Sequence, residues 1–123
     1  MINFTIELPP VTKKNHSQII MRGKYPKLIP SKQFREYQDN CQWFIPKIDT
    51  IKNPINLKAL FYMPTHRRVD LVNLLAALCD ILVHYGVIAD DNSKIIVSMD
   101  ESRVLYDKTS PRTEVTITEV EDA

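Results

Sequence analysis

Apolar and polar residues alternate in several parts of the chain, and two other parts repeat apolar residues every three or four positions. Alternation is typical of a strand with one buried face, whereas the longer period indicates an amphipathic helix. These patterns predict strands at 3–8, 56–63, 94–105 and 112–119, and helices at 31–44 and 71–85. The order β-α-β-α-β-β predicts an α+β fold, with a small mixed β-sheet and two main helices, in one domain over residues 1–123.

The ends of these elements carry residues that are typical of such positions. Ser31 and Asp70 stand where N-caps belong, since a side-chain oxygen there accepts a bond from an unpaired backbone N–H. Gly86 supplies the stop after the second helix. Residues 11–30 are polar, basic and bounded by prolines, which predicts a long loop. In so small a domain, a loop of that length is usually functional or disordered.

Length and composition exclude several classes of protein. The 123 residues are 44% hydrophobic and 25% charged, as in a soluble globular domain rather than a disordered chain. No apolar run is long enough for a membrane span, and the first ten residues lack the pattern of a signal peptide. Cys41 and Cys79 form neither a C-x-x-C pair nor a disulfide framework, so we expect reduced thiols and a cytoplasmic protein. Only two glycines are present, which excludes a glycine-rich phosphate loop.

The net charge of +1 conceals two halves of opposite sign. Residues 1–68 carry twelve basic and four acidic residues, a net charge of +8, and residues 69–123 carry four basic and eleven acidic residues, a net charge of −7. This asymmetry indicates either a surface for a polyanion beside a carboxylate cluster, or charge complementarity between the two halves of the fold. Within the basic loop, Tyr25 and His16 are candidates for contact with nucleic acid.

Three acidic residues stand near the ends of the second helix. Asp70 precedes it, and Asp90 and Asp91 follow it in a turn. Each has an ordinary interpretation, because aspartate is common both at N-caps and in turns. However, Arg67 and Arg68 lie just before Asp70, so cations meet a carboxylate where a strand ends and a helix begins. Hydrolysis of a phosphodiester uses such a combination, in which carboxylates hold Mg²⁺ and basic residues hold the nucleic-acid backbone.

Residues 67–96 resemble the RusA family of Holliday junction resolvases, which are small and often prophage-borne endonucleases. The family pattern has one or two basic residues, D-x-D-N-L, a helix with D-x-L, a glycine, and then D-D-x-x-[IV]. The chain matches this pattern without insertion at Arg67-Arg68, Asp70, Asn73-Leu74, Asp80-Ile81-Leu82, Gly86 and Asp90–Ile95. Softer likeness extends over most of the remaining chain.

The resemblance implies a homodimer that binds four-way junction DNA, not a membrane, and cuts two strands symmetrically. It implies Mg²⁺ as cofactor, with Mn²⁺ as a possible substitute. Asp70 and Asp91 match the metal-binding, catalytic carboxylates, and Asp90 is a candidate third ligand. The phosphate contacts are then expected from four basic residues: Lys13, Lys14, Arg67 and Arg68.

Two departures from the family pattern put catalysis in question. Val72 stands where the second motif aspartate belongs, and we expect it to pack, because valine offers no ligand. Ala76 replaces a lysine that would stabilise phosphate charge. Either Asp90 fills the gap, or the chain is a junction-binding protein that cuts weakly or not at all. A third hypothesis is a basic nucleic-acid-binding module whose acidic half contacts proteins.

Overall fold

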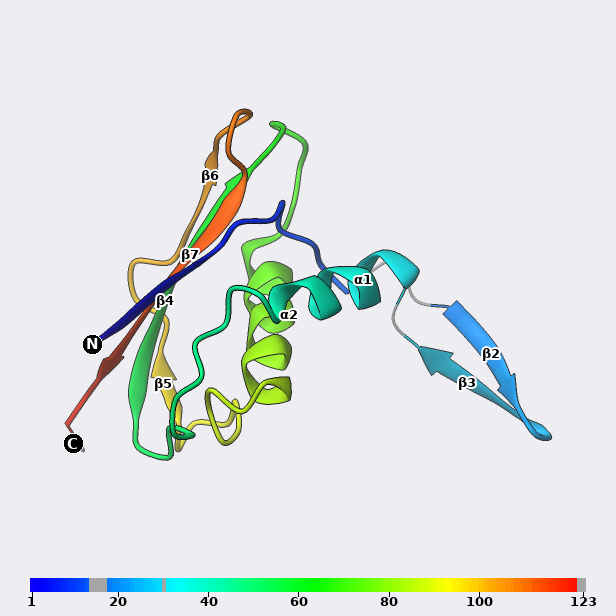
Figure 1. Ribbon diagram of the computed structural model, residues 1–123, viewed down its shortest axis with the longest axis horizontal. Helices are drawn as coiled ribbons and strands as arrows, with labels where there is room; N and C mark the ends of the chain where they lie inside the picture. The colour runs from blue at the N-terminus through cyan, green and yellow to red at the C-terminus, as the bar shows by residue number, and fades with distance from the viewer. Residues whose placement is uncertain (14–17, 30, 122–123) are drawn as a thin grey trace.

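The computed structural model describes residues 1–13, 18–29 and 31–121 (Figure 1). The strands are β1 (Ile2–Ile6), β2 (Gln18–Arg22), β3 (Tyr25–Ile29), β4 (Ile55–Met63), β5 (Ile96–Ser98), β6 (Arg103–Tyr106) and β7 (Arg112–Glu119). The helices are α1 (Lys32–Cys41) and α2 (Leu71–His84). The predicted α+β fold with a mixed sheet and two helices is therefore confirmed.

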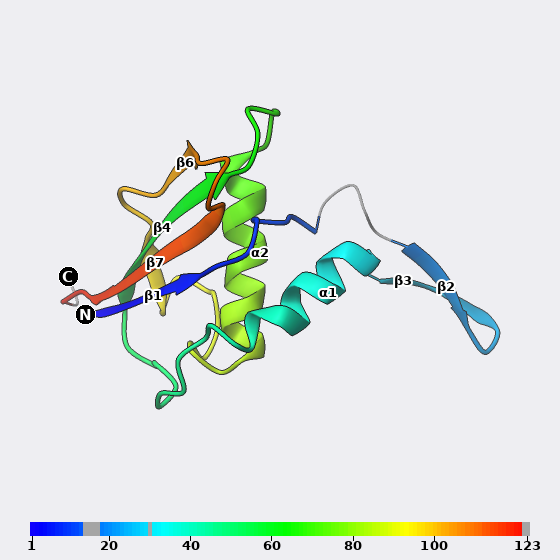
Figure 2. The ribbon, with the colours of Figure 1, turned by 45° about the horizontal axis from the view of Figure 1, so that its top comes forward.

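The main sheet is built around β7 and β4. β1 and β4 lie on either side of β7, and both run antiparallel to it. The other edge of β4 is shared, since β5 pairs with its start and β6 with its end, both in parallel. Parallel strands need a crossover connection, and α2 provides it. Asp70 and the first turn of α2 therefore lie near the end of β4, whereas the last turn returns toward the start of the strand (Figure 2).

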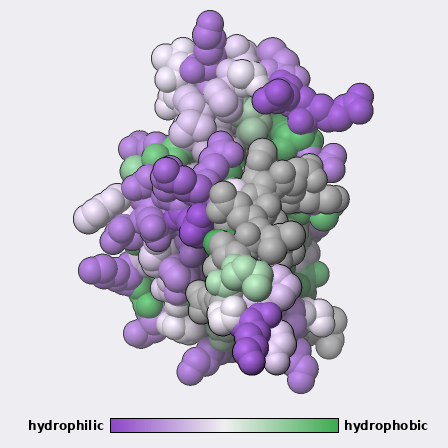
Figure 3. Space-filling model, turned by 90° about the vertical axis from the view of Figure 1, so that its right-hand side faces the viewer, coloured by the Kyte–Doolittle hydropathy of each residue, from purple (hydrophilic) through white to green (hydrophobic). Residues whose placement is uncertain are grey.

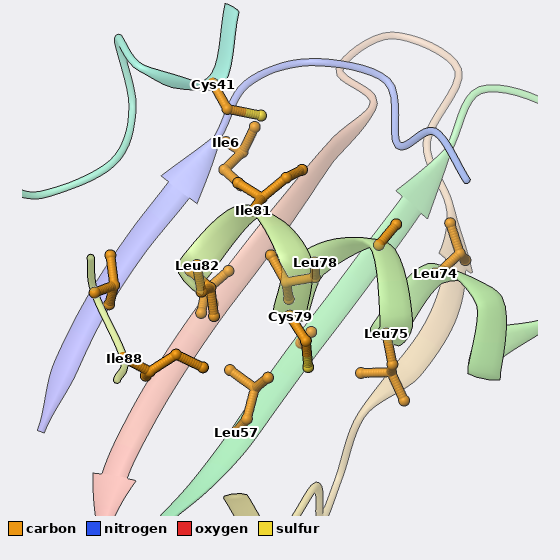
Figure 4. Packing of buried hydrophobic residues seen from close by; sticks show 14 of the residues in the cluster. Ile6, Cys41, Leu57, Leu74, Leu75, Leu78, Cys79, Ile81, Leu82 and Ile88 are labelled. Atoms are coloured by element: carbon orange, nitrogen blue, oxygen red, sulfur yellow. The ribbon is translucent and has the colours of Figure 1, made fainter. Parts of the chain in front are cut away.

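The core lies between the two helices and one face of the sheet. Alternate residues of β4 are buried, as the period of two requires for a strand with one covered face. Figure 4 shows Leu78, Cys79 and Leu82 of α2 on the side of the helix that faces Leu57 of β4. Phe34, one of three buried residues of α1, joins the same cluster. Burial of each large apolar side chain contributes about 1.5–3 kcal/mol, so this interface holds the helices on the sheet.

The predicted loop over residues 11–30 is wrong for its second half, which forms a β-hairpin. β2 and β3 pair in antiparallel register, with Arg22 opposite Tyr25. Gly23 and Lys24 make the two-residue turn, and Gly23 has φ +61°. Type II′ hairpin turns prefer glycine at the first central position. Gly23 is therefore a local signal in the sequence for this hairpin.

The predicted strand 94–105 is also divided in two. A turn at residues 99–102 separates β5 from β6, and Glu101 adopts φ +69° within it. Asn56 stabilises this turn, because its Oδ1 accepts a hydrogen bond from the backbone N–H of Asp100 at 2.8 Å. A long-range contact of this kind leaves no periodic signal. No helix in the described part of the chain is long and apolar enough to cross a membrane.

Candidate active site

A cleft of about 740 Å³ opens where β4 ends and α2 begins. Its walls come from the segment after β1, the first turn of α1, the end of β4 and the first turn of α2. The residues that line it are Pro9, Pro10, Val11, Thr12, Gln33, Met63, Pro64, Thr65, Arg67, Arg68, Val69, Asp70, Asn73 and Leu74. The structure thus brings together three of the predicted site residues, Asp70, Arg67 and Arg68.

Asp70 occupies the N-cap position of α2, but its side chain caps no backbone N–H. Its Oδ2 instead accepts a hydrogen bond from Nδ2 of Asn73, at 3.3 Å, and its side chain is exposed. The carboxylate is therefore oriented by one amide and otherwise faces solvent at the cleft. A helix N-terminus also favours anions, both this carboxylate and an incoming phosphate.

Arg67 and Arg68 lie on the short segment between β4 and α2, and both are exposed. Neither forms an ion pair with any residue that the structure describes, so both guanidinium groups are available for phosphate. The segment is held at its start by His66, whose ring stacks on Tyr106 with 3.8 Å between the centroids. The two arginines line the cleft together with Asp70, the one carboxylate among the described residues that line it.

Asp90 and Asp91 lie near the other end of α2. Ala89 is held beside the start of β4, because its N–H donates to the carbonyl of Ile51 at 3.0 Å. Together with burial, the charge of Asp91 helps to raise the pKa of Cys79 in the second half of α2, and neither aspartate lines the cleft. Asp90 is engaged within its own turn, where its carboxylate accepts from the N–H of Asp91 at 2.7 Å and from Asn92 at 3.2 Å.

These positions decide how the acidic residues fit a metal ion. Among the described residues, no group of three or more His, Cys, Asp or Glu side chains could hold an ion together. Mg²⁺, however, keeps several waters and is often bound by one or two carboxylates together with substrate phosphates. Asp70 fits that requirement at the cleft, whereas Asp91 does not line the cleft within one chain.

The two predicted lysines are placed differently. Nζ of Lys13 donates to Oδ2 of Asp80 at 2.9 Å and lies 5.6 Å from the ring centroid of Phe34. The segment before the hairpin is thereby joined to both helices. Lys14 lies outside the described residues.

Val72 and Ala76 lie on the outer flank of α2. The expectation that Val72 packs is wrong, because 74% of its surface is exposed. Ala76 is exposed as well, one turn further along. Together with Val83, which is 36% exposed, they form an apolar stripe along the helix, and we call these three residues the α2 stripe.

The two charged halves of the sequence are only sparsely joined by ion pairs. Of the five ion pairs found among the described residues, two connect a basic residue of the first half to an acidic residue of the second, Lys13 to Asp80 and Lys58 to Glu101. Internal complementarity thus accounts for a small part of the asymmetry. The surplus of basic residues on the first half favours a polyanionic partner.

Sequence reasoning did not find every residue that shapes the site. Gln33, in the first turn of α1, lines the cleft, and no sequence motif predicts that position. Tyr106 lies 40 residues from His66 in the chain, and only the parallel pairing of β6 with the end of β4 brings it there. The role of Asn73 had a local signal, because residues three apart on a helix are neighbours.

Comparison with known families supports the chemistry that the cleft suggests. Residues 7–118 match the family described as Endodeoxyribonuclease RusA. A search of curated proteins finds no match to the chain. The matched range includes both helices, the hairpin, the cleft and the Asp90–Asp91 turn, and the chain therefore belongs to the RusA family of endodeoxyribonucleases.

Proposed function

We propose that this chain is a Mg²⁺-dependent endonuclease that binds four-way DNA junctions as a homodimer and cuts two strands, in DNA recombination and repair. The observation that carries the proposal is the cleft, where Asp70 stands at a helix N-terminus beside two arginines that form no ion pair with any described residue. Family membership supplies the substrate class, since the RusA family comprises Holliday junction resolvases.

In this proposal, the basic residues of the cleft bind DNA phosphates and its carboxylate serves the chemistry. Arg67 and Arg68 hold the phosphates on either side of the scissile bond, and the first turn of α2 favours the same charge. Asp70, oriented by Asn73, would be the residue of the cleft that holds Mg²⁺. When bound there, Mg²⁺ supplies Lewis-acid activation of the phosphodiester and of the attacking water.

A second copy of the chain offers a way to bring Asp91 to this site. The α2 stripe leaves Val72 and Val83 exposed near opposite ends of the helix. Two α2 helices packed antiparallel along this stripe place the N-terminus of one beside the C-terminus of the other. Asp70 of one copy then lies beside the Asp90–Asp91 turn of the second copy, twice in a symmetric pair. Two equivalent sites match the paired cuts that junction resolution requires.

A non-cutting junction-binding protein is the second candidate, favoured by one observation. Among the described residues that line the cleft, Asp70 alone carries a carboxylate, and Val72 presents methyl groups where a ligand is expected. Such a chain keeps the arginines for binding but holds an ion weakly.

The deciding experiment uses a labelled synthetic four-way junction and a linear duplex of the same sequence, with Mg²⁺, Mn²⁺ or EDTA. We expect paired nicks in the junction with either metal, none with EDTA, and none with Asp70→Asn, which retains binding. Tight junction binding without cleavage in any metal would support the second candidate. Equal affinity for junction and duplex, without cleavage, would leave only a general nucleic-acid-binding module.

A further inference from the structure

The hairpin of β2 and β3 stands apart from the body of the molecule. Among the described strands, these two pair only with each other, in a sheet separate from the main one. Figures 1 and 2 both show the hairpin projecting beyond α1, on the side away from the main sheet. A two-stranded hairpin is marginally stable in water by itself. This arm is therefore poorly explained as a contribution to the core.

The tip of the hairpin combines positive charge with exposed apolar side chains. Tyr25 is 76% exposed and Met21 is 65% exposed. Residues 18–29 include three basic residues and no acidic residue. Figure 3 views the molecule from this end, and the coloured part of its surface is mostly hydrophilic, with small, separate hydrophobic patches. An aromatic ring beside cations is the combination that binds bases and phosphates together.

The register of the hairpin places these side chains on its two faces. Arg22 pairs with Tyr25 and Met21 with Pro26, so Tyr25 and Met21 belong to successive pairs. Successive pairs in a ribbon point to opposite faces. Each face of the tip therefore carries one exposed apolar side chain, Tyr25 on one and Met21 on the other. The tip is also thin, because Gly23 turns the chain with φ +61° and open space surrounds the position where a side chain would begin.

The base of the hairpin adjoins the cleft. Val11 and Thr12, which precede the hairpin by six or seven residues, and Gln33, four residues after it, line the same cleft as Asp70. The Lys13–Asp80 ion pair and the Ser31 cap on Phe34 hold both sides of this base. Five residues of strand extend the tip about 15 Å beyond this base, so DNA would reach the tip by running from the cleft along α1 toward the hairpin.

We propose that the hairpin tip is a wedge that enters the branch point of a DNA junction, where Tyr25 stacks on an unpaired base and Lys24 contacts a phosphate. The inference rests on the proposed function and adds the element that distinguishes a junction from a duplex. Bases at a branch point are accessible to stacking, whereas bases within a duplex are already stacked on both sides. Insertion of an apolar side chain into a continuous duplex costs unstacking energy, so the wedge favours the branched substrate.

The test measures affinity for a four-way junction and for a linear duplex at one salt concentration, with Tyr25→Ala, Tyr25→Phe and the parent chain. Trp43→Ala is the matched control, because Trp43 is also 76% exposed but lies in the turn after α1. We expect Tyr25→Ala to weaken junction binding about fivefold to a hundredfold, the range for one base–aromatic stack, with less than about twofold change on duplex. Tyr25→Phe and Trp43→Ala should stay within about twofold of the parent on both substrates.

A second readout detects the stack itself. A 2-aminopurine placed at the branch point should lose fluorescence when the parent or Tyr25→Phe binds, and keep it with Tyr25→Ala. Equal weakening of junction and duplex by Tyr25→Ala would show a groove contact and overturn the wedge. An unchanged junction preference in Tyr25→Ala would also overturn it, while leaving the proposed function intact. A parent chain with no junction preference would overturn the proposed function and the wedge together.

Discussion

The ammonium group of Lys13 donates to Oδ2 of Asp80 over 2.9 Å, across 67 residues of sequence. The contact ties the segment that leads into the hairpin to the middle of α2. Both side chains are about two-fifths exposed, so the pair contributes about 0.2–1 kcal/mol to stability in solvent. Its larger consequence concerns DNA, because the charge of Lys13 is already balanced by a carboxylate.

If Lys13 contacts a phosphate, it must exchange Asp80 for that phosphate. Asp80→Asn should then tighten junction binding and steepen its salt dependence by about one unit, and Lys13→Ala should do the reverse. Binding titrations over a salt series measure both effects. Lys58→Ala is the control, since Lys58 also pairs with an acidic residue, Glu101, at 3.7 Å but lies away from the cleft. If Asp80→Asn and Lys13→Ala weaken junction binding equally and leave its salt dependence unchanged, the Lys13–Asp80 pair anchors the segment and touches no DNA.

The separation of Asp70 from Asp91 leads to a prediction about mixed dimers. Asp70→Asn and Asp91→Asn should each abolish cleavage while keeping junction binding, because either loss removes an ion ligand. When the two variants are unfolded together and refolded, heterodimers regain one complete site if each site takes Asp70 from one chain and Asp91 from the other. We then expect nicking of one strand, at up to half the parental rate per dimer. Two inactive variants that stay inactive after mixing, in a preparation shown to contain heterodimers, would place both ligands in one chain.

The two cysteines predict a specific response to alkaline pH. Burial raises the pKa of Cys41 and of Cys79 to about 12, and for Cys79 the charges of Asp91 and Asp80 contribute. The folded chain holds these protons more tightly than the unfolded chain, whose thiols titrate near 9. Their contribution to stability is therefore complete below about pH 9 and is lost as the pH rises toward 12. Urea unfolding at several pH values should show a shallower alkaline decline in a Cys41→Ala, Cys79→Ala double variant, and identical slopes would contradict the assignment.

Local patterns in the sequence predicted most of the fold. The alternation at residues 112–119 matches β7 in full, and the apolar period that begins at Leu71 matches α2 to within one residue. Ser31 caps α1 as expected, with its Oγ accepting from the N–H of Phe34 at 3.1 Å. Each of these signals lies within the element that it predicts. The division of residues 94–105 had no such signal, because its cause is Asn56, which lies 44 residues before Asp100.

The candidate site was predictable only in part, because residues that are far apart in the sequence leave no local signal of how close they lie in the fold. Arg67, Arg68 and Asp70 are close in sequence and stay close in the fold. Asp90 and Asp91 are linked to them by a shared motif, but a motif gives no distance, and neither aspartate lines the cleft within one chain. Whether two copies reunite them depends on an interface, which a single sequence does not specify.

Val72 provides the sharpest test of catalytic competence. Its side chain is 74% exposed in the first turn of α2, so an aspartate there needs no repacking. A negative charge in the first turn is also favoured by the helix dipole, by about 0.3–1 kcal/mol. Val72→Asp should therefore leave the fold of the single chain intact, and because Val72 belongs to the α2 stripe, cleavage is compared at concentrations where sedimentation shows the variant as a dimer. Because it adds a carboxylate two residues from Asp70, it should raise Mg²⁺-dependent junction cleavage, strongly if the natural site is short of ligands.

The same substitution at another exposed valine separates this effect from simple added charge. Val97 on β5 is 49% exposed and lies outside the cleft, and Val97→Asp should leave cleavage unchanged. Ala76→Lys should raise the rate only when it is combined with Val72→Asp, since a lysine stabilises phosphate charge only where an ion has already activated the bond. If the parent, Val72→Asp and the double variant all bind junctions, and none cuts them with Mg²⁺ or Mn²⁺, the nuclease proposal fails. The exposed arginines beside Asp70 would then serve binding alone, and junction recognition by the hairpin would be the activity that remains.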